Sequence, residues 1–86
     1  MTLQEQFKDA QERVKTLTTR PSNDTLLELY SLFKQGSEGD VTGKRPGMLD
    51  LKGRAKYDAW AARKGTSRDK AMELYVALVD RLLQNK

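Results

Sequence analysis

The heptapeptide LYSLFKQ, residues 29–35, combines aromatic and basic side chains at helical spacing. Tyr30, Phe33 and Lys34 are three and four positions apart, so they would be neighbours on one face of a helix. Leu26 begins the same stripe one turn earlier. The stretch therefore predicts an amphipathic helix whose face is either part of a core or a surface for an aromatic, anionic ligand.

The residues on either side of this stretch mark the ends of the helix. Pro21 interrupts the preceding pattern, and Ser22 or Asn23 can cap a new helix because their side chains accept hydrogen bonds from free backbone N–H groups. Gly36 is a natural stop, since glycine is favoured just after a helix. We therefore predict a helix between one of these caps and Gly36.

The N-terminal segment shows the same periodicity over a longer stretch. Steps of four and three separate its apolar residues, which are Leu3, Phe7, Ala10, Val14 and Leu17. Thr2 can cap this segment, and Glu5 follows in capping-box register. The pattern predicts a helix over residues 3–17 with one buried face.

A loop and a third helix are predicted after Gly36. The segment GSEGDVTGKRPG, 36–47, holds four of the six glycines and one of the two prolines. Loops of this length are usually functional or disordered. The third helix begins near Asp50 or Leu51 and runs to Lys64, where Gly65 ends it.

A fourth helix completes the predicted architecture. Thr66 or Ser67 can cap it, and its apolar stripe comprises Ala71, Tyr75, Leu78 and Leu82. No strand-like alternation or internal repeat competes with these helices. We predict an all-α fold in which four helices form one domain over residues 1–86.

The composition excludes several classes of function. The 86 residues include no cysteine and no histidine, which rules out disulfides, thiolate nucleophiles and histidine-based catalysis or metal binding. No pair of carboxylates shows a spacing typical of acid–base catalysis. The net charge of +4 suggests an anionic partner. We therefore expect a binding protein without a cofactor or metal rather than an enzyme.

Neither a membrane span nor a signal peptide is predicted. The longest uninterrupted apolar run is YVALV, 75–79, whereas a membrane-spanning helix needs about 20 residues. The N-terminal residues MTLQEQFKDA lack a basic start followed by an apolar block. We expect a soluble, cytoplasmic protein without stable membrane insertion.

A group of cations is predicted on one face of the third helix. Lys52, Lys56 and Arg63 fall within a narrow arc of the helical wheel, and Trp60 lies on its flank. Like charges at i and i+4 are unfavourable by a few tenths of a kcal/mol, so either this face is solvated or an anion lies between the lysines. A nucleic acid is one possible anionic ligand for this face. Acidic residues are interspersed on every predicted helix, however, and they would repel its phosphates.

Three blocks together carry a family resemblance. They are LYSLFKQGSEGD at 29–40, RPGMLDLKGRAKYDAW at 45–60 and GTSRDKAMELY at 65–75. The chain resembles the acyl-CoA-binding proteins over essentially its whole length. The resemblance implies an up-down-down-up four-helix bundle with a long loop between the second and third helices. It also implies a monomeric carrier of medium- to long-chain fatty acyl-CoA esters, in transient contact with acyl-CoA-using enzymes.

The resemblance also implies the ligand-binding residues. Those expected to bind the CoA head group of the ligand are Lys15, Tyr30, Phe33, Lys34, Lys52, Lys56 and Tyr75. Those expected along the acyl groove are Phe7, Gln11, Leu26 and Leu27. Three positions depart from the commoner family pattern: Phe33 replaces a second tyrosine, Tyr57 a tryptophan, and Gln11 an alanine.

Overall fold

The computed structural model describes residues 1–84, and within this range all regular structure is helical. The elements are α1 (Leu3–Arg13), the 3-10 helix η1 (Val14–Thr16), α2 (Asn23–Glu38), α3 (Leu51–Ala61) and α4 (Arg68–Gln84). The predicted all-α fold with four α-helices is confirmed.

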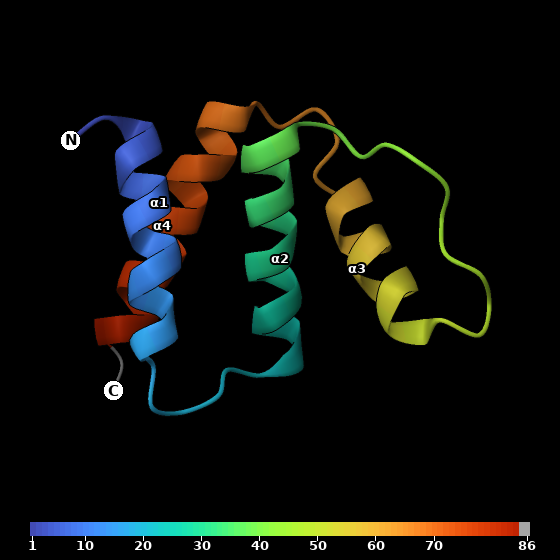
Figure 1. Cartoon of the computed structure of the whole chain (residues 1–86), viewed down its shortest axis with the longest axis horizontal. Helices are drawn as coiled ribbons and strands as arrows, with labels where there is room; N and C mark the ends of the chain where they lie inside the picture. The colour runs from blue at the N-terminus through green and yellow to red at the C-terminus, as the bar shows by residue number, and fades with distance from the viewer. Residues whose placement is uncertain (85–86) are drawn as a thin grey trace.

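Each helix packs against the next in the spatial order α1, α4, α2 and α3. Figure 1 shows α1 and α4 running in one direction, and α2 and α3 in the other, which is the predicted up-down-down-up arrangement. α2 packs against both α4 and α3, and α1 packs against α4. α3 therefore lies at one edge of the molecule, as Figure 1 shows, with the loop 39–50 outside it.

Short polar side chains at the N-termini of the helices accept hydrogen bonds from backbone amides. Thr2 and Glu5 form the predicted capping box at α1. The Ser22 hydroxyl accepts a hydrogen bond from the Thr25 amide (3.2 Å), and the Asp50 carboxylate accepts one from the Gly53 amide (2.9 Å). At α4, Ser67 has this role, since its hydroxyl accepts a hydrogen bond from the Lys70 amide at 3.0 Å. These caps satisfy backbone donors that have no partner within the helix.

The predicted first helix, 3–17, is too long by one turn. α1 ends at Arg13, and the chain continues as η1 before Leu17 adopts an extended conformation with ψ of 130°. The Thr16 hydroxyl donates a hydrogen bond to the carbonyl oxygen of Arg13 (2.7 Å), which favours this tighter turn. The apolar periodicity thus extends into a segment that is no longer α-helical.

Two predicted stops are also displaced. α2 does not end at Gly36 but continues to Glu38, and Gly39, with φ of 84°, follows it. Gly36 is buried, and a Cβ built on it would lie 3.0 Å from Cζ of Phe7, so glycine is needed there for close packing. α3 ends at Ala61 rather than at Lys64, and a turn over 62–65 completes the segment.

The apolar core lies between α1, α2 and α4. Its buried members are Phe7, Ala10, Leu29, Leu32, Ala71, Met72, Tyr75, Leu78 and Val79. α3 contributes Trp60, which is buried and whose indole Nε1 donates a hydrogen bond to the Gly39 carbonyl oxygen at 2.8 Å. The position of α3 thus depends on α2 and on the first residues of the loop.

A polar cluster joins the end of α2 to the turn between α3 and α4. The fully buried side chain of Gln35 donates hydrogen bonds to the Thr66 carbonyl oxygen (2.6 Å) and to the Asp40 carboxylate (2.9 Å). Asp40 also accepts a hydrogen bond from the Gly65 amide at 2.9 Å. The Gly65 amide and Gln35 hold the pKa of Asp40 below its ordinary value, because both stabilise the charged carboxylate.

The lowered pKa of Asp40 makes one part of the stability dependent on pH. Since the pKa is lower in the folded chain, this stabilisation is present above the unfolded-state pKa and is lost as the pH falls through the folded-state pKa. We expect Asp40→Asn to lower the free energy of unfolding at neutral pH and to lower it less in acid. Urea titrations at several pH values test this. Glu73→Gln is the control, because Glu73 is exposed on α4; equal pH profiles for the two variants would contradict the prediction.

Candidate ligand-binding site

Two cavities lie on either side of the N-terminal half of α2. The first, of about 380 Å³, is lined by Val14, Lys15, Leu17, Thr19, Arg20, Pro21, Leu26, Leu29, Tyr30, Phe33 and Tyr75. The second, of about 480 Å³, is lined by Arg20, Asn23, Leu26, Leu27, Tyr30, Leu51, Lys52, Ala55 and Lys56. Arg20, Leu26 and Tyr30 line both. The cavities are therefore neighbours that can hold two parts of one elongated ligand.

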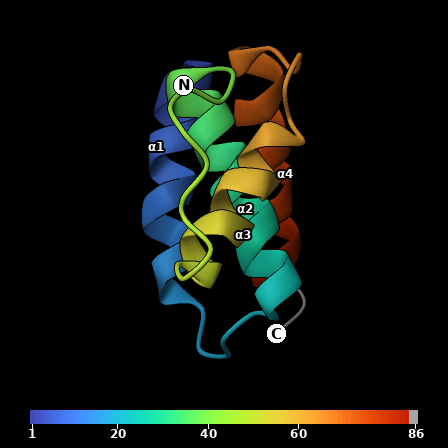
Figure 2. The same cartoon turned by 90° about the vertical axis from the view of Figure 1, so that its right-hand side faces the viewer.

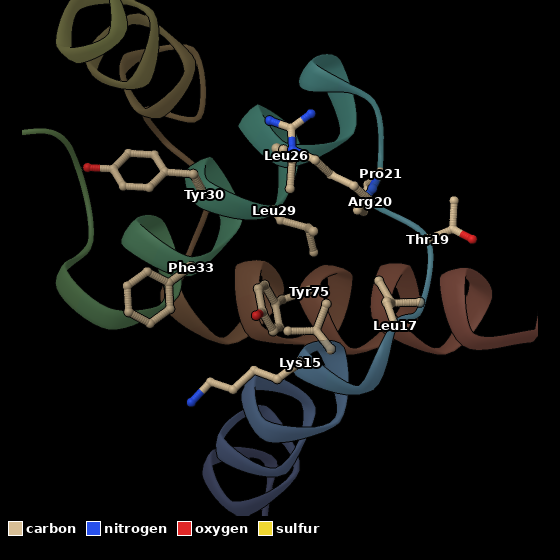
Figure 3. A pocket seen from close by; sticks show the side chains of 11 residues that line it. Lys15, Leu17, Thr19, Arg20, Pro21, Leu26, Leu29, Tyr30, Phe33 and Tyr75 are labelled. Atoms are coloured by element: carbon tan, nitrogen blue, oxygen red, sulfur yellow. The ribbon is translucent and has the colours of Figure 1, made fainter.

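The first cavity has aromatic walls and a basic rim. Figure 3 shows Phe33 and Tyr75 on its wall, with the Lys15 side chain extending beside them. The Tyr75 ring is fixed by an edge-on contact with Phe7, at 5.2 Å between centroids. Its burial raises the pKa of the Tyr75 hydroxyl, so this group stays protonated and able to donate a hydrogen bond.

Lys15 can contact a ligand bound in the first cavity. Its ammonium group lies 3.4 Å from Glu12, and the two side chains are 71% and 68% exposed. An ion pair this exposed contributes little stability, so an anion in the cavity can compete for the lysine. Aromatic faces with an exposed cation at the rim suit a planar base and a phosphate.

The second cavity combines apolar walls with two lysines on α3. Lys56 lies over the Tyr30 ring, with Nζ 5.3 Å from the centroid, and Lys52 is one turn earlier. Neither lysine forms an ion pair with any residue in the range 1–84. The apolar part of the lining comes from Leu26, Leu27, Leu51 and Ala55. Such a surface can hold an alkyl chain with an anionic group at its end.

Three residues predicted for the ligand site line neither cavity. Lys34 is paired with Glu38, and its Nζ lies 4.7 Å from the centroid of the Trp60 ring. Phe7 is buried in the core, and Gln11 is partly buried on α1. The other predicted residues, Lys15, Tyr30, Phe33, Lys52, Lys56, Tyr75, Leu26 and Leu27, are brought together around the two cavities.

Arg20 is the main residue that sequence reasoning missed. It lines both cavities, and its guanidinium donates a hydrogen bond to the Asn23 side chain at 3.2 Å. Arg20 lies in the irregular segment between η1 and α2, where no periodic pattern assigns a side chain to a face. The one feature of the sequence that marks Arg20 is its position directly before Pro21, near the start of α2.

The predicted common face of Lys52, Lys56 and Arg63 does not form. Arg63 follows the end of α3 and turns toward α2, where its Nε donates a hydrogen bond to the Ser31 hydroxyl at 3.1 Å. Trp60, expected on the flank of that face, is buried. The face predicted for nucleic acid therefore lacks Arg63 and Trp60, and nothing within residues 1–84 supports that alternative.

Residues 1–84 contain no group of three or more acidic, histidine or cysteine side chains placed to hold a metal ion. Separately, none of the helices in this range is both long enough and apolar enough to cross a membrane.

The sequence and the fold are similar to those of known proteins. The family model described as acyl CoA binding protein matches residues 4–79. The acyl-CoA-binding protein homolog 1 of Caenorhabditis elegans is 58% identical over 77 residues, which cover 90% of each chain. The crystal structure of acyl-CoA-binding protein 2 of Oryza sativa superposes with a TM-score of 0.92 at 46% identity, covering 96% of this chain and 90% of that one. The chain described here belongs to the acyl-CoA-binding protein family.

Proposed function

We propose that this protein binds medium- to long-chain fatty acyl-CoA esters and carries them in the cytoplasm, without catalysing a reaction on them. The observation that carries the proposal is the pair of adjoining cavities, both of which combine apolar walls with basic side chains, while the first also has the aromatic rings of Phe33 and Tyr75. A fatty acyl-CoA suits such a pair of cavities, because it joins an aromatic base and phosphates to an alkyl chain. Family membership supports the same ligand.

The two cavities suggest how the ligand is divided between them. The adenine base stacks in the first cavity beside Tyr30, Phe33 and Tyr75, which offer flat apolar surfaces. The acyl chain lies in the second cavity along Leu26 and Leu27. Tyr30, which lines both, is then next to the junction.

Cations at the rims supply the charge that the phosphates require. Lys52 and Lys56 have no acidic partner within residues 1–84, and Lys56 lies over the Tyr30 ring. A phosphate between them would offset the repulsion of like charges one helical turn apart. Arg20, at the boundary of the cavities, can reach the diphosphate with a planar group that donates two hydrogen bonds at once.

In this role the protein is a carrier rather than a catalyst. It shields the alkyl chain from water and keeps the thioester away from other reactants. It acts as a monomer, with residues 1–86 as one acyl-CoA-binding domain, and contacts acyl-CoA-using enzymes only transiently. No cofactor or metal is needed for this role, because binding consists of apolar burial and charge-assisted hydrogen bonds.

Affinity should rise with the length of the acyl chain until the second cavity is filled. Each buried methylene contributes up to about 0.8 kcal/mol, so two more methylenes should tighten binding by up to about one order of magnitude. Isothermal titration calorimetry with free CoA and a series of acyl-CoA esters measures this. The proposed function would be wrong if free CoA and a long-chain ester bound equally, or if a free fatty acid bound as well as its CoA ester.

Lys56→Ala should weaken binding of a long-chain acyl-CoA by about tenfold or more, because a charge-assisted hydrogen bond to phosphate is lost. Lys70→Ala, an exposed lysine on α4, is the matched control and should leave affinity unchanged. A thermodynamic cycle with the analogue lacking the 3′-phosphate locates the contact. If Lys56 binds that phosphate, the mutation costs little further affinity for the analogue; purely additive losses would contradict the assignment.

Lys34→Ala should cost less affinity than Lys56→Ala. Lys34 is paired with Glu38, so binding a phosphate requires it to leave that partner. Removing the competitor by Glu38→Gln should then tighten binding by up to about fivefold, the range expected for a partly exposed ion pair. Calorimetry on the two variants tests this. An unchanged affinity in both would show that Lys34 does not contact the ligand.

A further inference from the structure

The positive charge of the chain is concentrated in one short segment. Residues 44–56 contain five basic side chains and one acidic one, which gives this segment a net charge of +4. The remainder of the chain has eleven basic and eleven acidic residues, so its net charge is zero. The segment comprises the second half of the long loop and the first half of α3. The whole excess charge of the protein is therefore carried at one edge of the fold.

The same segment exposes the large apolar side chains. Met48 is 79% exposed, Leu49 101% and Leu51 74%, and the other exposed large apolar residue within 1–84 is the N-terminal Met1. Residues 48 and 49 form a turn just before α3, closed by a hydrogen bond from the Asp50 amide to the Gly47 carbonyl oxygen at 3.0 Å. In Figure 1 this turn is at the outer, lower edge of the molecule, and Figure 2 shows the loop in front of α3.

Most of the basic groups around this turn are free to bind an anion. Lys44, Lys52 and Lys56 form no ion pair within the described range, whereas Arg45 is held by Asp58 at 2.7 Å. The single acidic residue of the segment, Asp50, is occupied as the cap of α3. The turn at 48–49 and Leu51, together with Lys44 and Lys52, form a basic apolar tip.

We propose that the basic apolar tip docks on the surface of an anionic lipid bilayer. Met48 and Leu49 would enter the headgroup region, and the lysines would contact anionic lipid heads. A few apolar side chains with cations around them suffice for such a contact, because apolar burial and attraction to anionic lipid add together. A stable protein–protein interface buries about 800 Å² on each partner, more than three side chains at a protruding turn provide.

The position of the tip also connects docking with the ligand. Leu51 belongs to the tip and lines the second cavity, where the proposed function places the acyl chain. If that function holds, a docked molecule has this cavity beside the bilayer, so that the chain can pass between protein and lipid over a short path. Docking itself does not depend on the ligand and can be measured without it.

Vesicle flotation of the ligand-free full chain at physiological salt tests the proposal. Vesicles of phosphatidylcholine with phosphatidylserine should bind the protein about tenfold more strongly than vesicles of phosphatidylcholine alone. Leu49→Ser should reduce binding to the anionic vesicles by about tenfold, through loss of apolar burial. Lys44→Glu should reduce it by about fivefold or more, whereas Lys8→Glu, the same charge change on α1, should have little effect.

Several outcomes would overturn docking by the tip. Equal losses in Lys44→Glu and Lys8→Glu would indicate attraction by net charge alone, and unchanged binding in Leu49→Ser would exclude insertion. A concentration-dependent increase in mass that Leu49→Ser abolishes would assign the tip to a second copy of the chain instead.

Leu49 and Lys44 line neither cavity, so both variants should keep wild-type affinity for acyl-CoA. Vesicle binding by a protein without acyl-CoA affinity would support docking while contradicting the proposed function.

Discussion

The hydrogen bond from the Trp60 indole to the Gly39 carbonyl oxygen joins the C-terminal end of α3 to the residue that follows α2. α3 packs against α2 and lies apart from α1 and α4, so it is not held by the central core. Trp60 is its buried anchor, at the end nearest the polar cluster of Gln35 and Asp40. The other end of α3 carries Leu51 and Lys52, and there the two helices enclose the second cavity. Fixing one end of α3 thus leaves room for a ligand at the other.

α2 has core residues and cavity-lining residues next to each other in the sequence. Leu29 and Leu32 are buried in the core, whereas Tyr30 lies between the two cavities. Phe33 does both, since it packs near Phe7 at 6.2 Å between ring centroids and also lines the first cavity. The stretch LYSLFKQ therefore supplies both core residues and cavity-lining residues, and Phe33 belongs to both groups.

Local sequence signals predicted the helices well, because capping and apolar periodicity act over a few residues. Tertiary packing decided the features that sequence reasoning missed. Gly36 has the residue type of a helix stop, but the approach of the Phe7 ring explains it, and that contact comes from another helix. A helical wheel that includes Arg63 assumes a helix beyond Ala61, where α3 has already ended. Arg20 could not be assigned at all, since an irregular segment gives no period from which to place a side chain.

The attachment of α3 through one neighbour has a consequence for motion. Elements with few buried contacts open locally at a lower free energy than the whole fold. Separating α3 from α2 leaves the core of α1, α2 and α4 in place, because that core contains no residue of α3. A ligand held between the two helices contacts both, so its binding energy is added to the cost of this opening. The bound molecule would then supply apolar contacts between α2 and α3 that the free protein lacks. Amide protons of α3 would therefore exchange more slowly in the complex than in the free protein.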